Sequence, residues 1–470
     1  DVNFASVPAV DRCTSCHLGI DNPDFLDAPQ PFTTHPRLDL YITSASPHSI
    51  DQFGCTSCHA GRARGTTFNS SSHTPGSIEQ KEEWEEKYDW EKIHHWLQPM
   101  LPTQYTQASC FTCHESQPVV EGGEKLSLGL GLISKSGCNN CHHIESYPKQ
   151  NNAGPPLTHL DQKLSKEWVA KWIEDPQSFR YNTWMPHFFH QDNNSDEESI
   201  KRNHMEIYAM TEYLFENGEK KINNSSKFIG NKESGEKLFS AVGCMGCHQI
   251  DENPQDVTFD NLPYDLYTSN NGYDEKEMTR YELLKNQGPN LIGMGSKSDA
   301  EWIYNWIKNP SEYYPGTRMP DLRLTHEEAA DITAYLLTFE NKEFENDSAP
   351  VYSSVEMENI ARRWLVKSFP ESEANSKLEK MTDLDVVQYV GKKSINYYGC
   401  YTCHDIKGFE EAKPIGVELT HEGSKPLNKL EFAHIHSIEH ANYAWFEQKL
   451  ANPRIFDRGK VVPHEDKSRM

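Results

Sequence analysis

The chain contains 470 residues, of which 36% are hydrophobic, and its formal net charge at pH 7 is −24. This length is typical of about three domains, and the hydrophobic fraction is low for such a chain, so we expect a cofactor to fill part of the core. The acidity argues against nucleic acid as a partner, because the phosphate backbone repels a negative surface. The best apolar run, 126–133, is too short for a membrane-spanning helix, which needs roughly 18 apolar residues.

Six copies of the pattern Cys-Xaa-Xaa-Cys-His occur along the chain, and together they use all twelve cysteines. Chance placement at this composition would give about 0.01 copies. The pattern is the attachment signature of c-type haem, in which both cysteines form thioethers and the histidine binds the iron. A zinc clip or a redox dithiol would not require a histidine at the same place six times. The sequence therefore predicts six haem c groups with their irons.

No thiol is left for a disulfide, a redox pair or a nucleophile, and no catalytic residue is predicted. The cysteines predicted to attach haem are Cys13 and Cys16, Cys55 and Cys58, Cys110 and Cys113, Cys138 and Cys141, Cys244 and Cys247, and Cys400 and Cys403. The histidines predicted to bind the irons beside them are His17, His59, His114, His142, His248 and His404.

The first three motifs lie close together in residues 1–120, a segment with many prolines and little helical periodicity. We expect this segment to be irregular and to be held together by its haems. The candidates for the second axial position of these three irons are His35, His48, His73, His94 and His95. If all three irons bind two histidines, at least two of these candidates are surplus, and the sequence does not say which.

The last three motifs are preceded by similar stretches, 121–144, 234–250 and 390–406, each with Gly-Xaa-Lys near its start and Gly-Cys at the motif. A tryptophan and a proline eight residues apart follow each stretch: Trp168 and Pro176, Trp302 and Pro310, and Trp445 and Pro453. This repetition predicts three related helical modules. A polar stretch, 251–285, is expected to be an insertion in the second one.

A methionine stands nine residues after the proline in the first two modules, at Met185 and Met319, and 17 residues after it in the third, at Met470. Thioether sulfur stabilises reduced iron and raises its potential relative to a second imidazole. We therefore expect Met185, Met319 and Met470 to be axial ligands. The histidines that could replace Met470 are His421, His434, His436 and His440.

After Met319, an amphipathic helix is expected with Thr325 as its N-cap and acids in its first turn. A weaker equivalent is expected at about 197–215, and the third module has none. Loops with Gly154-Pro155 and Gly288-Pro289 precede the tryptophan helices of the first two modules.

This order of helix, CxxCH, Gly-Pro loop, tryptophan helix, Met-Pro and closing helix resembles the class I cytochrome c fold. The resemblance implies a mainly α chain in which an irregular trihaem N-terminal domain is followed by three class I cytochrome c-like helical domains. The expected domains are 1–120, 121–228, 229–345 and 346–470, the last of them without a closing helix.

The stretches DRCTSCHLGIDNP, PFTTHP, FGCTSCHAGRARGTTF and IHHWLQPMLP are similar to multihaem cytochrome subunits that accompany membrane cytochrome b and Rieske-type quinol-oxidising complexes. The resemblance implies such a complex, or a soluble cytochrome, as redox partner. Haem is attached to CxxCH outside the cytoplasm, and the chain starts at Asp1 as a processed protein would. We therefore expect a periplasmic or otherwise exported protein.

The sequence thus predicts an electron-transfer protein in which three bis-histidine haems of low potential precede three methionine-ligated haems of higher potential. Two alternatives remain open: a multihaem reductase with one open iron, and an extracellular filament-forming cytochrome. The reductase requires a vacant axial position, and the filament favours bis-histidine ligation throughout.

Overall fold

The computed structural model describes residues 11–115, 117–145, 147, 154–180, 183, 185–218, 229–250, 288–348 and 350–469. These residues are mainly helical, as the sequence predicts. The chain forms two compact units. Unit 1 comprises residues 1–136, 145–147 and 424–429, and unit 2 comprises residues 137–144, 148–423 and 430–470.

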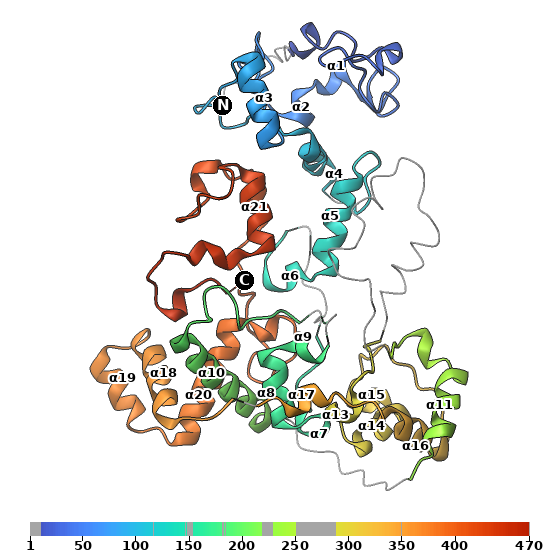
Figure 1. Cartoon of the computed structure of the whole chain (residues 1–470), viewed down its shortest axis with the longest axis vertical. Coiled ribbons are helices and arrows are strands. Elements are labelled where there is room, and N and C mark those ends of the chain that lie inside the picture. Colours follow the sequence, from blue (N-terminus) through green and yellow to red (C-terminus); the bar gives the residue numbers. More distant parts are fainter. Residues whose placement is uncertain are drawn as a thin grey trace. The chain divides into compact units, whose positions relative to one another are not determined.

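Unit 1 consists of short helices joined by long irregular connections (Figure 1). Its α-helices are α1 (Ile50–Phe53), α2 (Thr56–His59), α3 (Ile78–Tyr88), α4 (Phe111–His114) and α5 (Glu124–Lys135). Its 3-10 helices are η1 (Cys13–Ser15), η2 (Pro23–Phe25), η3 (Thr103–Cys110) and η9 (Leu427–Lys429). The strands β1 (Tyr41–Ile42) and β2 (His48–Ser49) pair in parallel, with Tyr41 opposite His48. The CxxCH motifs of this unit therefore lie on single turns, and irregular backbone connects them.

Unit 2 carries the longer helices. Its first helices are α6 (Cys138–Cys141), α7 (Leu160–Lys163), α8 (Lys166–Glu174), α9 (Pro176–Phe179), α10 (Glu197–Glu216) and α11 (Lys232–Ala241). They are followed by α13 (Met294–Lys297), α14 (Ala300–Lys308), α15 (Pro310–Tyr313), α16 (His326–Leu336), α17 (Lys342–Asn346), α18 (Ser354–Val366), α19 (Glu371–Leu378), α20 (Asp383–Tyr398) and α21 (Asn442–Ala451). Its 3-10 turns are η4 (Cys244–Gly246), η7 (Cys400–Thr402), η10 (Pro453–Asp457) and η11 (His464–Asp466).

One helical group in unit 2 is formed by α11, α14 and α16, in which α16 packs against both other helices. Its core contains the buried side chains of Phe239, Ile303 and Ile332. The predicted N-cap of α16 is confirmed, because the Thr325 hydroxyl accepts from Glu328 N and the Glu328 carboxylate accepts from Thr325 N. Both bonds satisfy donors that would otherwise have no partner at the helix end.

A second helical group brings together α10, α18 and α20, which lie side by side at the lower left of Figure 1. The predicted helix at 197–215 is confirmed by α10, whose N-cap Asp196 accepts from Ser199 N. Ile207 of α10 and Ile395 of α20 are completely buried in the shared core. Residues of α10 and α20 are far apart in the sequence, so this group is not built from one continuous segment.

A buried polar network lies in this second group. The Glu206 carboxylate accepts hydrogen bonds from Arg202 Nε at 3.0 Å and from Tyr398 Oη at 2.7 Å. His464 Nε2 lies 3.6 Å from Glu206 Oε2, and Arg202 also pairs with Glu465. Burial raises the pKa of the Glu206 carboxyl, but its interactions with His464, Arg202 and Tyr398 outweigh burial and lower the pKa to about 2.

Acid is therefore expected to unfold this group through Glu206. The pKa of Glu206 is about 2 in the folded chain, against 4.5 for an ordinary glutamate carboxyl. The stabilisation that the ionised carboxylate provides is therefore complete above pH 4.5 and is lost as the pH falls from 4.5 toward 2. The contribution is on the order of 3 kcal/mol. Urea unfolding followed by circular dichroism at about pH 6 and pH 3 should show less pH dependence in Glu206→Gln than in the parent chain.

The exposed Glu216 on the same helix supplies the control, because Glu216→Gln should keep the parent's pH dependence. Parallel losses of stability in the parent and in Glu206→Gln would show that other groups carry the acid sensitivity.

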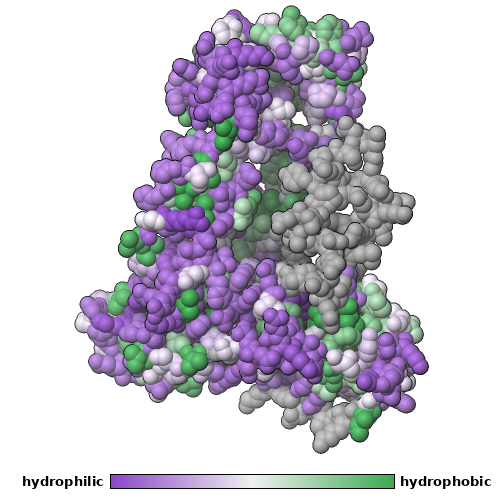
Figure 2. Space-filling model, in the orientation of Figure 1, coloured by the Kyte–Doolittle hydropathy of each residue, from purple (hydrophilic) through white to green (hydrophobic). Residues whose placement is uncertain are grey.

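Hydrophilic side chains predominate on the described part of the face in Figure 2. Of the helices the structure describes, none combines the length and the apolar character needed to cross a membrane.

Candidate haem-binding sites

Each CxxCH histidine of unit 1 faces one second histidine. The ring centroids of His17 and His73 are 6.4 Å apart, and so are those of His59 and His35. The third pair consists of His114 and His48, whose ring centroids are 5.9 Å apart. The structure therefore brings three of the five candidate histidines to the three motifs, one to each.

The separation of these pairs fits an iron between two imidazoles. Metal–imidazole bonds are about 2 Å long, and the ring centre lies roughly 1 Å beyond each nitrogen, so two rings on one metal have centroids about 6 Å apart. Burial lowers the pKa of His17, His35, His59 and His73, which favours the neutral imidazole that binds a metal. The donor set thus fits bis-histidine haem.

The other two candidates, His94 and His95, lie elsewhere. Both side chains are exposed, and within the described residues neither ring contacts a CxxCH histidine. These two histidines were candidates because they are adjacent and stand between tryptophans in the sequence. Such a pattern describes neighbours along the chain and does not predict which residues lie near a haem.

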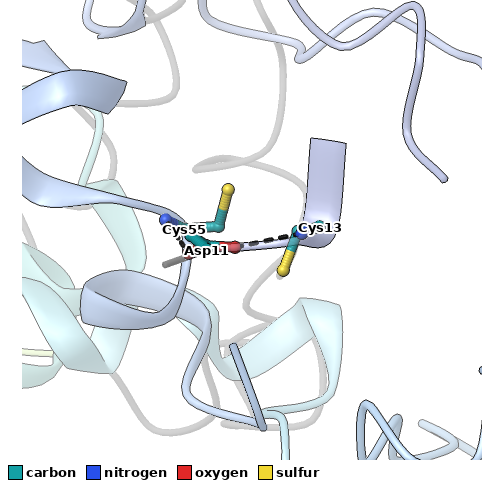
Figure 3. A group of neighbouring side chains, drawn as sticks. All are labelled: Asp11, Cys13 and Cys55. Atoms are coloured by element: carbon teal, nitrogen blue, oxygen red, sulfur yellow. Dashed lines mark hydrogen bonds between the residues drawn. The ribbon is translucent and has the colours of Figure 1, made fainter. Parts of the chain in front are cut away.

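Asp11 joins the first two motifs (Figure 3). Its carboxylate accepts backbone hydrogen bonds from Cys13 N at 3.1 Å, Cys55 N at 2.7 Å and Thr56 N at 3.2 Å. Ligand atoms of Asp11, Cys13 and Cys55 lie within 4.8 Å of one another, as a metal site would require. Since thioether bonds to haem would occupy both sulfurs, we interpret Asp11 as an acceptor that fixes two haem-attachment turns beside each other.

Asp11→Ala is expected to destabilise unit 1 by about 2 kcal/mol, because hydrogen bonds to a charged acceptor contribute about 1.5–3 kcal/mol and the backbone donors lose their partner. Urea unfolding of the haem-containing chain, followed by the Soret absorbance, measures the effect. The exposed Asp27 provides the matched control, and Asp27→Ala should change the unfolding free energy by less than about 0.5 kcal/mol. Equal effects of the two variants would contradict the role of Asp11.

The motif at Cys244–His248 lies in the group of α11, α14 and α16. His248 Nδ1 is 2.8 Å from the carbonyl oxygen of Pro289, so Nδ1 donates to the backbone and Nε2 is available to a metal. The indole Nε1 of Trp306 donates to Met319 Sδ at 2.9 Å. This hydrogen bond orients the sulfur of Met319, the predicted ligand. Burial lowers the pKa of His248.

The remaining two motifs of unit 2 repeat the backbone contact of His248. His404 Nδ1 is 2.7 Å from the carbonyl oxygen of Pro155, and His142 Nδ1 is 2.8 Å from that of Val417. A carbonyl oxygen that accepts from Nδ1 fixes the tautomer and the orientation of an imidazole whose Nε2 binds a metal. Burial lowers the pKa of His404 as it does that of His248.

Met185 has the same local geometry as Met319. Met185 N donates to Thr183 Oγ1 at 3.2 Å, as Met319 N does to Thr317 Oγ1 at 3.2 Å. Met470 and the predicted insertion at 251–285 lie outside the described residues. The four histidines considered as alternatives to Met470 are exposed: His421, His434, His436 and His440.

A cationic cluster that sequence reasoning missed lies between the two tryptophan helices. Lys297 Nζ is 5.0 Å from the ring centre of Trp168, and Lys163 Nζ is 4.7 Å from that of Trp302. Burial lowers the pKa of Lys163 to about 8, and within the described residues no carboxylate pairs with either lysine. Such a cluster suits carboxylates like the propionates of haem. In the sequence, the feature that could have revealed these two lysines is that each stands five residues before the tryptophan of its module, Trp168 or Trp302.

Comparison with known proteins identifies the class of one part of the chain. Residues 233–340 match the family model of cytochrome c. A cytochrome c of Nigella damascena is 27% identical over 109 residues, which are 23% of this chain and 88% of that protein. No solved structure matches the chain. The chain therefore contains a class I cytochrome c domain, which supports a haem-containing electron-transfer protein.

Proposed function

We propose that the chain is a hexahaem electron-transfer protein. The observation that carries this proposal is that each CxxCH histidine of unit 1 faces a second histidine at a separation suited to one iron, in a chain that also contains a cytochrome c domain. A zinc or dithiol function would leave these three histidine pairs without a role.

The proposed haem-binding residues attach the haem, bind the iron as proximal ligands or bind it as distal ligands. All twelve cysteines form thioethers to six haem c groups, and the histidine after each pair is the proximal ligand. The distal ligands proposed for unit 1 are His35, His48 and His73. The thioether ligands proposed for unit 2 are Met185, Met319 and Met470.

When bound, each haem supplies an iron that accepts and releases one electron. The protein sets the potential through its side chains, because two imidazoles stabilise the oxidised iron and a thioether stabilises the reduced one. Unit 1 is accordingly the low-potential part and unit 2 the high-potential part, so electrons enter at unit 1. With a protein ligand on each side, an iron would have no open position for a substrate.

The partner proposed from the N-terminal motifs is a cytochrome b and Rieske-type quinol-oxidising complex or a soluble cytochrome outside the cytoplasm. The net charge of −24 favours partners with basic docking surfaces. Complementary charge accelerates association and weakens with added salt.

Two measurements on the exported chain test the proposal. Its intact mass should exceed that of the polypeptide by six haem groups, and a spectroelectrochemical titration should separate a low-potential group from a higher one. Fewer than six haems would contradict the count. A high-spin ferric signal in the isolated protein would instead favour a reductase with an open iron.

A further inference from the structure

We propose that the haem on Cys400, Cys403 and His404 is enclosed by a cytochrome c fold made from two distant segments, 154–216 and 383–409. Met185 then binds the iron beside His404 and not the iron beside His142. This inference rests on the proposed function, since it takes Met185 as an axial ligand.

The domain at 233–340 provides the reference, because it is one continuous segment that matches cytochrome c. Its Gly288 N donates to Cys247 O at 3.0 Å, directly beside the contact between His248 and Pro289. Leu291 N then donates to Gln249 O at 2.8 Å. The chain after CxxCH and the Gly-Pro loop are thereby joined on both sides of the histidine.

The same three contacts occur at His404, but the Gly-Pro loop comes from a distant part of the chain. Gly154 N donates to Cys403 O at 2.8 Å, the His404 ring lies beside Pro155 O, and Leu157 N donates to Asp405 O at 3.0 Å. A Cβ atom on Gly154 would lie 2.3 Å from the ring of His404, as one on Gly288 would from the ring of His248. Only glycine permits this approach.

The packing of the helices supports the same exchange as the contacts of the Gly-Pro loop. In the reference domain α11 crosses α16, where a Cβ on Gly235 would lie 2.0 Å from Asp331 O. In the proposed fold α20 crosses α10, where a Cβ on Gly391 would lie 2.2 Å from Ala209 O. The helix before the motif of His404 therefore packs on the closing helix that follows Met185.

The tryptophan helix α8 also resembles its counterpart α14 in the reference domain. Trp168 and Trp172 of α8 stack with centroids 5.2 Å apart, as Trp302 and Trp306 of α14 do at 5.4 Å. The start of segment 154–216 thus contacts Cys403 of the motif, and its end, α10, packs on α20, the helix that leads into the motif. Met185 lies within that segment as Met319 lies within the reference domain.

The exchange is reciprocal at His142. Gly416 N donates to Cys141 O at 2.7 Å and Leu419 N donates to His143 O at 2.9 Å, beside the contact between His142 and Val417 O. The predicted domains 121–228 and 346–470 therefore exchange the segments that follow their motifs. Cys141 Sγ also lies 3.0 Å from Thr402 Oγ1, so the two attachment sites are neighbours.

Haem deletion in the full chain tests the exchange. With Met319→Ala and Met470→Ala in place, the weak sulfur-to-iron charge-transfer band at the far-red edge reports the bond of Met185 alone. Adding Cys400→Ala and Cys403→Ala should abolish the band, whereas adding Cys138→Ala and Cys141→Ala should leave it. The reverse pattern would overturn the exchange and keep the proposed function. If the background chain with Met319→Ala and Met470→Ala already lacks the band, Met185 is not an axial ligand.

Loss of a haem can unfold its surroundings, so a second test uses a variant in which all six attachment sites are intact. In the same background, Gly391→Val drives a side chain into Ala209 O and should remove at least half of the band intensity. Leu130→Ala, on the helix before the motif of His142, should leave the band unchanged. An intact band in Gly391→Val, or a band lost in Leu130→Ala, would overturn the exchange.

The matched positive control lies in the reference domain. Gly235→Val in a chain with Met185→Ala and Met470→Ala should remove the band of Met319, since its Cβ meets Asp331 O in the same way. Haem content, measured as the pyridine haemochrome, should remain at six groups in Gly391→Val, Leu130→Ala and Gly235→Val.

Discussion

Replacing Met319 by histidine is expected to abolish the sulfur-to-iron band of one haem and to lower its midpoint potential by a few tenths of a volt, within the about 0.8 V that axial ligands span. The sulfur of Met319 accepts from Trp306 Nε1 at 2.9 Å and lies in the domain that matches cytochrome c. Imidazole in its place stabilises the oxidised iron. Spectroelectrochemical titration of the full chain measures the shift.

Met245 provides the control, because it is 63% exposed and stands between the two cysteines of the same motif, beside the proximal histidine His248. Met245→His should leave both the band and the titration unchanged. A potential that does not fall in Met319→His would contradict thioether ligation of this iron.

Replacing His73 by alanine is expected to open one iron of unit 1. The ring of His73 lies 6.4 Å from that of His17, stacks on Phe68 at 4.2 Å and has Nδ1 2.8 Å from Phe68 O, so its Nε2 is oriented for a metal. Without it, a high-spin ferric signal and binding of carbon monoxide should appear at one of the six proposed haems. Electron paramagnetic resonance and a carbon monoxide titration measure both.

The exposed His94 and His95 supply matched controls. His94→Ala and His95→Ala should remain low-spin and should not bind carbon monoxide. If either variant opened an iron and His73→Ala did not, the assignment of the distal histidines would be wrong.

Helix positions followed closely from local sequence. Thr325 and Glu328 form the capping box of α16, and the expected helix at 197–215 is α10. Caps and amphipathic periodicity act within a few residues, so they are legible without the fold. The Gly-Pro loops of the first two modules each lie beside a CxxCH histidine, but that of Gly154-Pro155 contacts His404 of the third module and not His142 of its own module.

The sequence by itself predicts where haem attaches, since both cysteines and the histidine of each motif lie within five residues. It also limited the distal ligands of unit 1 to five histidines. Only the tertiary structure placed His35, His48 and His73 beside the CxxCH histidines and Pro155 beside His404. The physical reason is that the sixth ligand and the enclosing loop reach an iron through space, and the spacing of residues along the chain carries no record of that distance.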